Sequence, residues 1–346
     1  IETDSNLKTY HVSSRYFSGT RMSRFSGRLD KIISILRAER PSVVELGSPY
    51  ILPYAGYYCQ RHFASLLVGF YHTDFPMANI ESAVGKIFSA NMSQGIRKVA
   101  ESYARNTYNR FDMTLAVSRK LVRKLQRTGI ERVRKLKLGV DLELFTPMRR
   151  DWEYRRSLGV GDEETLLIYS GRLKREKRID VLLDAFKMIS EYFRGKLIIT
   201  GDGPCRSSVI KTSQRMHKIE YFPVLTDRNK LARLLASADI YVTASPYENL
   251  GLSIHQAQAC GLPVVGVATD VFKDLVPDSV GVLGPVDSPH DLALNIMSLS
   301  SQDLRSMRNS ARTWAEDNYS WEKTFSHQFR LYERLLRRKA KNFHEN

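Results

Sequence analysis

One segment in the second half of the chain, residues 236–266, places a strand, a loop and a helix start in direct succession. Residues 236–244 read ASADIYVTA, a pattern typical of a buried parallel strand. The loop SPYENL follows, and Gly251 opens the next helix. Ligands of open α/β sheets bind at the carboxyl ends of strands, and the free N–H groups and dipole of a helix start attract anions. The segment therefore predicts an α/β sheet with a diphosphate site at this loop.

Glu248 lies on this loop, three residues before Gly251. A carboxylate repels phosphate. One interpretation is therefore that Glu248 accepts hydrogen bonds from the hydroxyls of a sugar. The other interpretation is that Glu248 only caps the helix, since acidic residues are common near helix starts. This segment alone leaves both open.

Strands and helices alternate along the whole chain, which indicates βαβ units and two doubly wound domains. The extended connector LGVDLELFTP interrupts the alternation, and we take its end as the domain boundary. The expected organisation is a first domain over 1–147, a second domain over 148–320 and a terminal helix over 321–346. The expected strands are 42–46, 66–71 and 113–117 in the first domain, and 166–170, 196–200, 219–223, 239–243 and 263–267 in the second.

Two further loops of the second domain follow predicted strands. GRLKREKRID carries Arg172 and Lys177. The planar guanidinium of the arginine and the mobile ammonium group of the lysine suit a diphosphate. An exposed basic loop is the plainer interpretation. GDGP carries Gly201 and Gly203, which let a backbone approach a ligand closely but are also ordinary turn residues. Together, the three loops are stronger evidence for a diphosphate site than any one of them.

The chain is strongly basic, with a formal net charge of +16 and many of the cations between residues 97 and 156. Anionic lipid head groups would suit this charge, and so would an ordinary solvated helix face. The chain lacks recognisable nucleic-acid-binding motifs, which argues against a nucleic acid partner. Its three cysteines have no metal-ligand spacing and favour a reducing, cytoplasmic location, and no apolar run is long enough to span a bilayer. We expect a protein that is soluble or peripheral to a membrane.

The ordered set LGVDLELFTP, SGRLKREKRIDVLLDAF, GDGP, SADIYVTASPYENLGLSIHQAQACGLPVVG and YSWEKT resembles the retaining GT-B glycosyltransferases of family four. The resemblance runs from about Val117 to the carboxyl end. It implies an α/β fold of two Rossmann-like doubly wound domains that face a cleft. The second domain would hold the nucleotide sugar and the first the acceptor, and the helix over 321–346 would pack back on the first domain.

The resemblance also implies roles for individual residues. Arg172 and Lys177 match the diphosphate-binding pair, and Glu248 matches the first glutamate of a paired motif beside the donor sugar. His72, in HTDFP, is similar to a histidine beside that sugar, although a histidine that only caps a strand end is the alternative. The donor-binding positions are completed by Gly201, Gly203, Leu250, Gly251, Leu252 and Gln256.

Three departures from the family pattern stand out. Gln256 replaces the second glutamate, and an amide that accepts a hydrogen bond without charge weakens ribose binding by about 1 kcal/mol. Arg178 replaces the glycine usual after Lys177. The Gly-rich turn expected near the amino terminus is missing, so we expect the first domain to lack its amino-terminal βαβ unit.

From these features we expect a retaining hexosyl- or mannosyl-type transferase that uses a GDP- or UDP-linked sugar, with no cofactor and no metal site. The acceptor would be a lipid-linked or polysaccharide glycan of the cell envelope, reached at the inner face of a membrane. A catalytically silent nucleotide-sugar-binding or scaffold protein would also explain Gln256. A basic nucleic-acid or membrane binder would also explain the charge.

Overall fold

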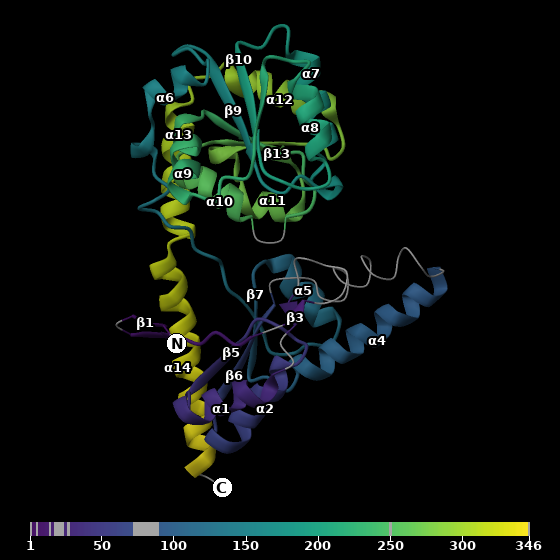
Figure 1. The fold of residues 1–346 in the computed structure, drawn as a ribbon, viewed down its shortest axis with the longest axis vertical. Coiled ribbons are helices and arrows are strands. Elements are labelled where there is room, and N and C mark those ends of the chain that lie inside the picture. The colour runs from purple at the N-terminus through teal and green to yellow at the C-terminus, as the bar shows by residue number, and fades with distance from the viewer. Residues whose placement is uncertain are drawn as a thin grey trace. The chain divides into compact units, whose positions relative to one another are not determined.

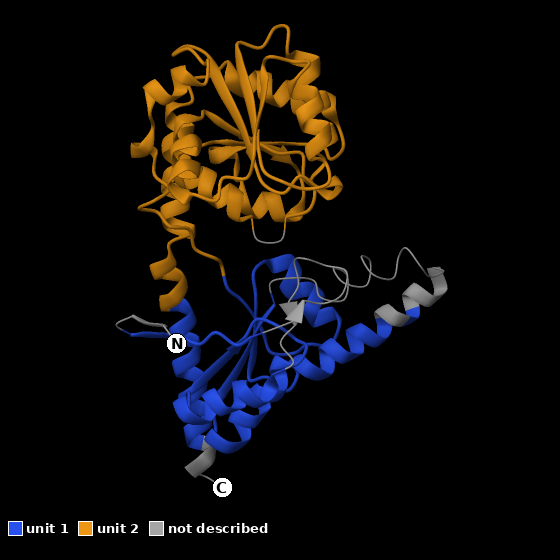
Figure 2. Cartoon of the chain, viewed as in Figure 1, with its two compact units in different colours: residues 1–136, 327–346 blue, residues 137–326 orange. Residues whose placement is uncertain are grey.

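The computed structural model describes residues 2–4, 6–13, 15–16, 24–25, 28–71, 90–248 and 251–344. Two compact units divide the chain (Figure 2). Unit 1 comprises Ile1–Leu136 and His327–Asn346, and unit 2 comprises Lys137–Ser326. Each unit contains its own parallel sheet with helices, so the expected α/β fold with two Rossmann-like domains is confirmed.

Unit 2 is built on a six-stranded parallel sheet of order β11-β10-β9-β12-β13-β14 (Figure 1). Its strands are β9 (Thr165–Ser170), β10 (Gly195–Thr200), β11 (Ile219–Phe222), β12 (Ile240–Val242), β13 (Val264–Val267) and β14 (Gly281–Gly284). Its helices are α6 (Trp152–Ser157), α7 (Ile179–Ile189), α8 (Arg206–Ser213), α9 (Arg228–Ser237), α10 (Leu252–Ala259), α11 (Asp270–Leu275), α12 (Pro289–Ser300) and α13 (Arg305–Asn318), with short 3-10 turns η1 (Pro147–Arg149), η2 (Arg175–Lys177) and η3 (Asp278–Val280).

Both faces of this sheet are covered, which explains why its strands are apolar at nearly every position. Successive residues of a strand point to opposite faces. Leu166 and Ile168 of β9 therefore join one core cluster with residues of α9, α10 and α13. Leu167 and Tyr169 join the other cluster with residues of α7, α8 and α12.

The strand order of unit 2 reverses beside its first strand. From β9 the chain adds β10 and β11 on one side, and then returns to place β12, β13 and β14 on the other side. The topological switch point therefore lies between the neighbouring strands β9 and β12. Open α/β sheets bind ligands at such a point, beyond the carboxyl ends of their strands.

Unit 1 contains a four-stranded parallel sheet of order β5-β6-β7-β8. Its strands are β5 (Val43–Leu46), β6 (Leu66–Tyr71), β7 (Met113–Ala116) and β8 (Val133–Lys135), and its helices are α1 (Leu29–Glu39), α2 (Leu52–Phe63), α4 (Ala90–Tyr108) and α5 (Arg119–Arg127). Two short antiparallel pairs precede them, β1 (Glu2–Asp4) with β2 (Leu7–Thr9) and β3 (Arg15–Tyr16) with β4 (Arg24–Phe25).

The last helix, α14 (Trp321–His344), covers one face of the unit 1 sheet. Tyr332 is buried with Leu66 and Val68 of β6, and Leu335 packs against the same cluster. The Nε2 of Gln328 donates a hydrogen bond to Glu45 Oε2 at 2.6 Å, and the Tyr332 hydroxyl bonds to the same oxygen. A carboxylate of β5 thus anchors the helix.

The boundary between the compact units lies between Leu136 and Lys137, whereas the sequence-based domain boundary was at Pro147. The connector packs on unit 2, because Val140 and Phe145 are buried in that unit's core and the Val140 N–H donates to the Tyr319 carbonyl at 2.8 Å. Similarly, α14 changes unit after Ser326 rather than at its start. An extended segment without strand or helix periodicity gives no sequence signal for the side on which it packs.

A buried ion-pair network lies at the start of β12, at the amino-terminal end of this strand of the unit 2 sheet. Asp239 Oδ2 lies 2.7 Å from Arg155 Nη1 and accepts a hydrogen bond from the Leu166 N–H at 2.8 Å. Its other oxygen lies 2.7 Å from Arg150 Nη2. The Arg155 side chain is 1% exposed, so it depends on this carboxylate for compensation of its charge.

Asp239→Asn should therefore lower the free energy of unfolding of unit 2 by about 3–5 kcal/mol, because it leaves a buried guanidinium without its counter-charge. All three tryptophans, Trp152, Trp314 and Trp321, lie in unit 2, so tryptophan fluorescence during urea denaturation reports on this unit. Asp162→Asn is the matched control, because its partner Arg156 is exposed and such pairs contribute little. Equal urea midpoints for the two variants would contradict the prediction.

His255 is a buried histidine in the core of unit 2. It is 3% exposed, and its ring stacks on Tyr319 with centroids 3.6 Å apart. Neither ring nitrogen has a hydrogen-bond partner among the described residues. Burial lowers the pKa of His255 to about 3, because the charged ring would lose its hydration.

The unfolded chain binds a proton at His255 below about pH 6.5, whereas the native chain does so only near pH 3. Stability from this residue is thus present at neutral pH and is lost as the pH falls, by about 2 kcal/mol between pH 7 and pH 5. Urea denaturation followed by tryptophan fluorescence at these two pH values should show that His255→Leu removes this part of the loss. The exposed His290→Gln should keep it, and an unchanged loss in His255→Leu would refute the assignment.

Candidate active site

Three loops of unit 2 gather at one edge of its sheet. They follow β9, β10 and β12, which are neighbours in the sheet, and all three strands run parallel. The described parts of these loops span residues 171–178, 201–205 and 243–248. The sequence expectation that strand ends bring these loops together agrees with this order.

The loop after β10 packs directly on the loop after β9. Gly201 and Gly203 have φ of 151° and 150°, values that favour glycine. A Cβ at Gly201 would lie 1.9 Å from the Gly171 carbonyl oxygen, and one at Gly203 would lie 2.4 Å from that of Leu173. The close backbone approach at GDGP is therefore made to the neighbouring loop, and contact with a ligand remains a prediction.

Lys177 lies at the end of η2 and is 8% exposed. Its Nζ donates to Glu248 Oε1 at 2.6 Å and to the Tyr247 carbonyl at 2.8 Å. Buried Leu173 and Ile179 fix the loop on either side, and Arg178 at φ 49° turns the chain into α7. The loop after β9 and the loop after β12 are thereby joined across the switch point.

This ion pair keeps some of its hydrogen-bonding capacity. An ammonium group has three N–H donors, and Lys177 uses two of them on described residues. Glu248 Oε2 has no hydrogen bond within the described ranges. The pair can therefore offer one donor and one acceptor to a ligand, which suits a phosphate oxygen next to a sugar hydroxyl.

The structure does not bring Arg172 into contact with Lys177. The Arg172 side chain is 59% exposed, and its Nη2 lies 3.7 Å from Glu176 Oε1. Tyr169 links it to the site, since its hydroxyl donates to the Arg172 carbonyl at 3.0 Å. Burial raises the pKa of Tyr169 well above its usual value; Glu248 also raises it and Arg172 lowers it. Both charges therefore lie near this phenol.

The start of α10 forms the third part of the site. Gly251 precedes the helix at φ 63°, and a Cβ there would lie 2.7 Å from Leu275 Cδ1. Leu252, the first helical residue, is 42% exposed, and Gln256 on the second turn is half-buried. Among the described residues, the N–H groups of this first turn have no acceptor and are available to an anion. His72 and Leu250 lie outside the described residues, so their predicted roles remain predictions.

Sequence reasoning missed the direct pairing of Lys177 with Glu248. It also missed the hydrogen bond from Lys177 to the Tyr247 carbonyl. The two charged residues are 71 positions apart, and no local pattern connects them. The available signal was that both residues follow strands of one sheet. Their contact can be predicted only when the order of the strands in that sheet is known.

The described part of the chain contains neither a metal-binding cluster nor a membrane-spanning helix. No group of three or more His, Cys, Asp or Glu side chains there is arranged to hold a metal ion. None of the helices there is both long and apolar enough to cross a bilayer. All three cysteines are free thiols.

Known proteins resemble this chain over most of its length. A phosphatidylinositol dimannoside mannosyltransferase of Mycobacterium tuberculosis, described as GDP-mannose-dependent and alpha-(1-6), is 25% identical over 84% of this chain and 73% of its own. A glycosyltransferase structure from Rickettsia africae superposes with a TM-score of 0.72 at 16% identity, over 94% of this chain and 85% of its own. HepE of Anabaena, solved with UDP-glucose, gives 0.66 at 18% identity over 92% and 82%.

Two family models also match, and together they cover most of the chain. Residues 150–321 match "Glycosyl transferases group 1" and residues 3–144 match "Glycosyltransferase Family 4". The loops after β9, β10 and β12 all fall within the first match. The chain therefore belongs to the family 4 glycosyltransferases of GT-B fold.

Proposed function

We propose that this glycosyltransferase moves a hexose, of mannosyl type, from a GDP- or UDP-linked donor to a lipid-linked or glycan acceptor, with retention and without a metal ion. The mannosyltransferase of Mycobacterium tuberculosis is described as GDP-mannose-dependent, and HepE was solved with UDP-glucose. These names support the classes of donor and acceptor. The base and sugar of the donor follow from neither.

The observation that carries the proposal is the Lys177–Glu248 pair at the switch point. The departing nucleoside diphosphate needs positive charge where its own negative charge builds up. The remaining N–H of Lys177, the exposed Arg172 and the first turn of α10 can supply that charge from the protein alone. Glu248 Oε2 remains for a hydroxyl of the donor sugar.

The chemistry of transfer follows from these groups. The acceptor oxygen forms a bond to the anomeric carbon as the bond from that carbon to the diphosphate oxygen breaks. The acceptor proton passes to the departing phosphate, which leaves as nucleoside diphosphate. One oxygen of Glu248 is already occupied by the Lys177 ammonium group, so no proton transfer is assigned to Glu248. His72, predicted beside the donor sugar, would assist by orienting it.

We also propose that the protein works at the cytoplasmic face of an anionic membrane. Helix α5 supports this, because it exposes cations along a short length of unit 1: Lys120, Arg123 and Arg127. Each cation near an anionic surface adds about 1 kcal/mol of attraction. A lipid-linked acceptor would then be delivered at the same surface.

Lys177→Ala should weaken nucleoside diphosphate binding by about 10- to 100-fold, because it removes a charge-assisted hydrogen bond. Calorimetry with GDP and UDP measures the binding. Release of nucleoside diphosphate from the sugar nucleotide, with a mannosylated phosphoinositide acceptor and EDTA present, measures the transfer. Activity that EDTA abolishes would contradict the metal-independent mechanism.

Two further variants separate the causes of a Lys177→Ala defect. The double variant Lys177→Ala, Glu248→Gln removes the unpaired carboxylate, and it should still bind weakly if the lysine itself holds phosphate. Lys211→Ala, an exposed lysine of α8, should bind as the unmutated chain does. Nucleotide binding without any turnover would instead identify the chain as a catalytically silent binder.

Gln256→Glu should tighten binding of the nucleotide sugar about fivefold, since it restores a charged acceptor for ribose hydroxyls worth about 1 kcal/mol. Titration calorimetry with the sugar nucleotide tests this. Gln214→Glu, an exposed change at the end of α8, adds the same charge away from the site. Equal affinities in these two variants would remove Gln256 from the donor site.

A further inference from the structure

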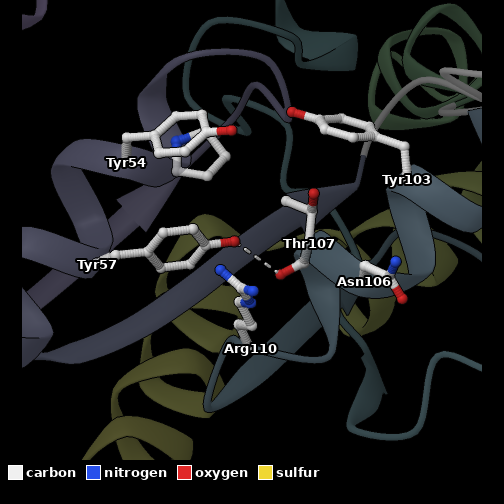
Figure 3. A pocket seen from close by; sticks show the side chains of 7 residues that line it. Tyr54, Tyr57, Tyr103, Asn106, Thr107 and Arg110 are labelled. Atoms are coloured by element: carbon white, nitrogen blue, oxygen red, sulfur yellow. Dashed lines mark hydrogen bonds between the residues drawn. The ribbon is translucent and has the colours of Figure 1, made fainter.

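A pocket of about 140 Å³ lies in unit 1 between α2 and α4, and nothing proposed above uses it. Pro53, Tyr54 and Tyr57 line it from α2. Tyr103, Asn106 and Thr107 line it from α4, and Arg110 follows that helix. Figure 3 shows the two tyrosines of α2 facing the α4 residues, with Arg110 between the two groups.

The walls of the pocket are held in place by hydrogen bonds to the backbone. The Tyr57 hydroxyl donates to the Thr107 carbonyl at 3.2 Å, which ties α2 to α4. The Tyr103 hydroxyl lies 2.8 Å from the Pro49 carbonyl and 2.9 Å from that of Tyr50. Their rings are therefore oriented before any ligand arrives, which lowers the entropic cost of binding.

Other polar groups of the pocket remain available. The Tyr54 hydroxyl, the Asn106 amide and the Arg110 guanidinium make no hydrogen bond or ion pair within the described ranges, although Arg110 lies over the Tyr57 ring at 5.4 Å. Asp112, the acidic residue nearest to Arg110 in sequence, is engaged with the Leu67 N–H at 2.7 Å and with Lys339 at 3.4 Å. The pocket thus presents a cation without a carboxylate partner in the described structure.

The size and shape of the pocket select one kind of ring. A cavity of roughly 150 Å³ holds a single six-membered ring such as benzene. The rings of Tyr54 and Tyr57 meet at 78°, so they form a corner rather than a flat slot. A puckered ring with C–H groups on several sides can contact both tyrosines, whereas a planar base can lie flat on only one of them. Its hydroxyls would meet Asn106 and the Tyr54 hydroxyl.

We propose that this pocket binds a six-membered polyol ring that carries an anionic group, with the ring against Tyr54 and Tyr57 and the anion on Arg110. Arginine matches a carboxylate or phosphate through two parallel N–H groups. The inference rests on the proposed function for one point, that the ring belongs to the acceptor. The ring is supplied either by an acidic or phosphorylated sugar or by an inositol phosphate head group, which share this chemistry.

Saturation-transfer NMR and calorimetry on the full chain test the proposal with methyl glucuronide, glucose 6-phosphate and inositol 1-phosphate. At least one of these should bind about tenfold more tightly than neutral methyl glucoside and than inorganic phosphate. The ligand that binds identifies the source of the ring. If none of the three exceeds both controls, the proposal is wrong.

Arg110→Gln should reduce the affinity for the anionic ring about tenfold, and Tyr54→Ala should abolish saturation transfer to the ring protons. Both side chains are exposed, so the fold should tolerate these changes, and circular dichroism checks this. Arg61→Gln, an exposed change on the same helix α2, should bind as the unmutated chain does. Unchanged binding in both pocket variants would overturn the proposal. GDP and UDP binding, measured in the same variants, reports separately on the unit 2 site.

Discussion

The parallel pairing of β9 with β12 is the constraint on which the candidate active site depends. It sets side by side two strands that are far apart in sequence, and the loops leaving them carry Lys177 and Glu248. The resulting ion pair is nearly enclosed, with 9% and 13% of the two side chains exposed, so a ligand meets a charge arrangement that is already fixed. Such preorganisation is what stabilisation of a leaving diphosphate requires.

Much of the fold could be predicted because its strands are buried on both faces. Expected strands such as 66–71 and 196–200 match β6 and β10. The sequence did not indicate β8 and β14, which lie at the edges of their sheets. Edge strands tolerate charges and glycines, as in VRK and GVLG, and so lack the apolar pattern.

The candidate site was predictable to the level of loops and residue types, but not of contacts. The sequence located Lys177, Glu248 and Gly251 at strand and helix ends, and family resemblance suggested their roles. It could not show that Lys177 would bond to Glu248, or that Arg172 would lie apart with Glu176, because side-chain pairing depends on loop conformation. The pocket of unit 1 was equally hidden, since its residues come from two helices that are separated in sequence by β6 and residues 72–89.

Helix α14 has a consequence for how the chain acquires its structure during synthesis. Tyr332 and Leu335 complete the core of a sheet whose strands β5 and β6 emerge from the ribosome hundreds of residues earlier. Unit 2 is contiguous between Lys137 and Ser326, so it can fold as one piece while the chain is still growing. Until α14 is synthesised, the apolar face of the unit 1 sheet lacks the helix that covers it. This face is the surface that a chaperone would have to shield.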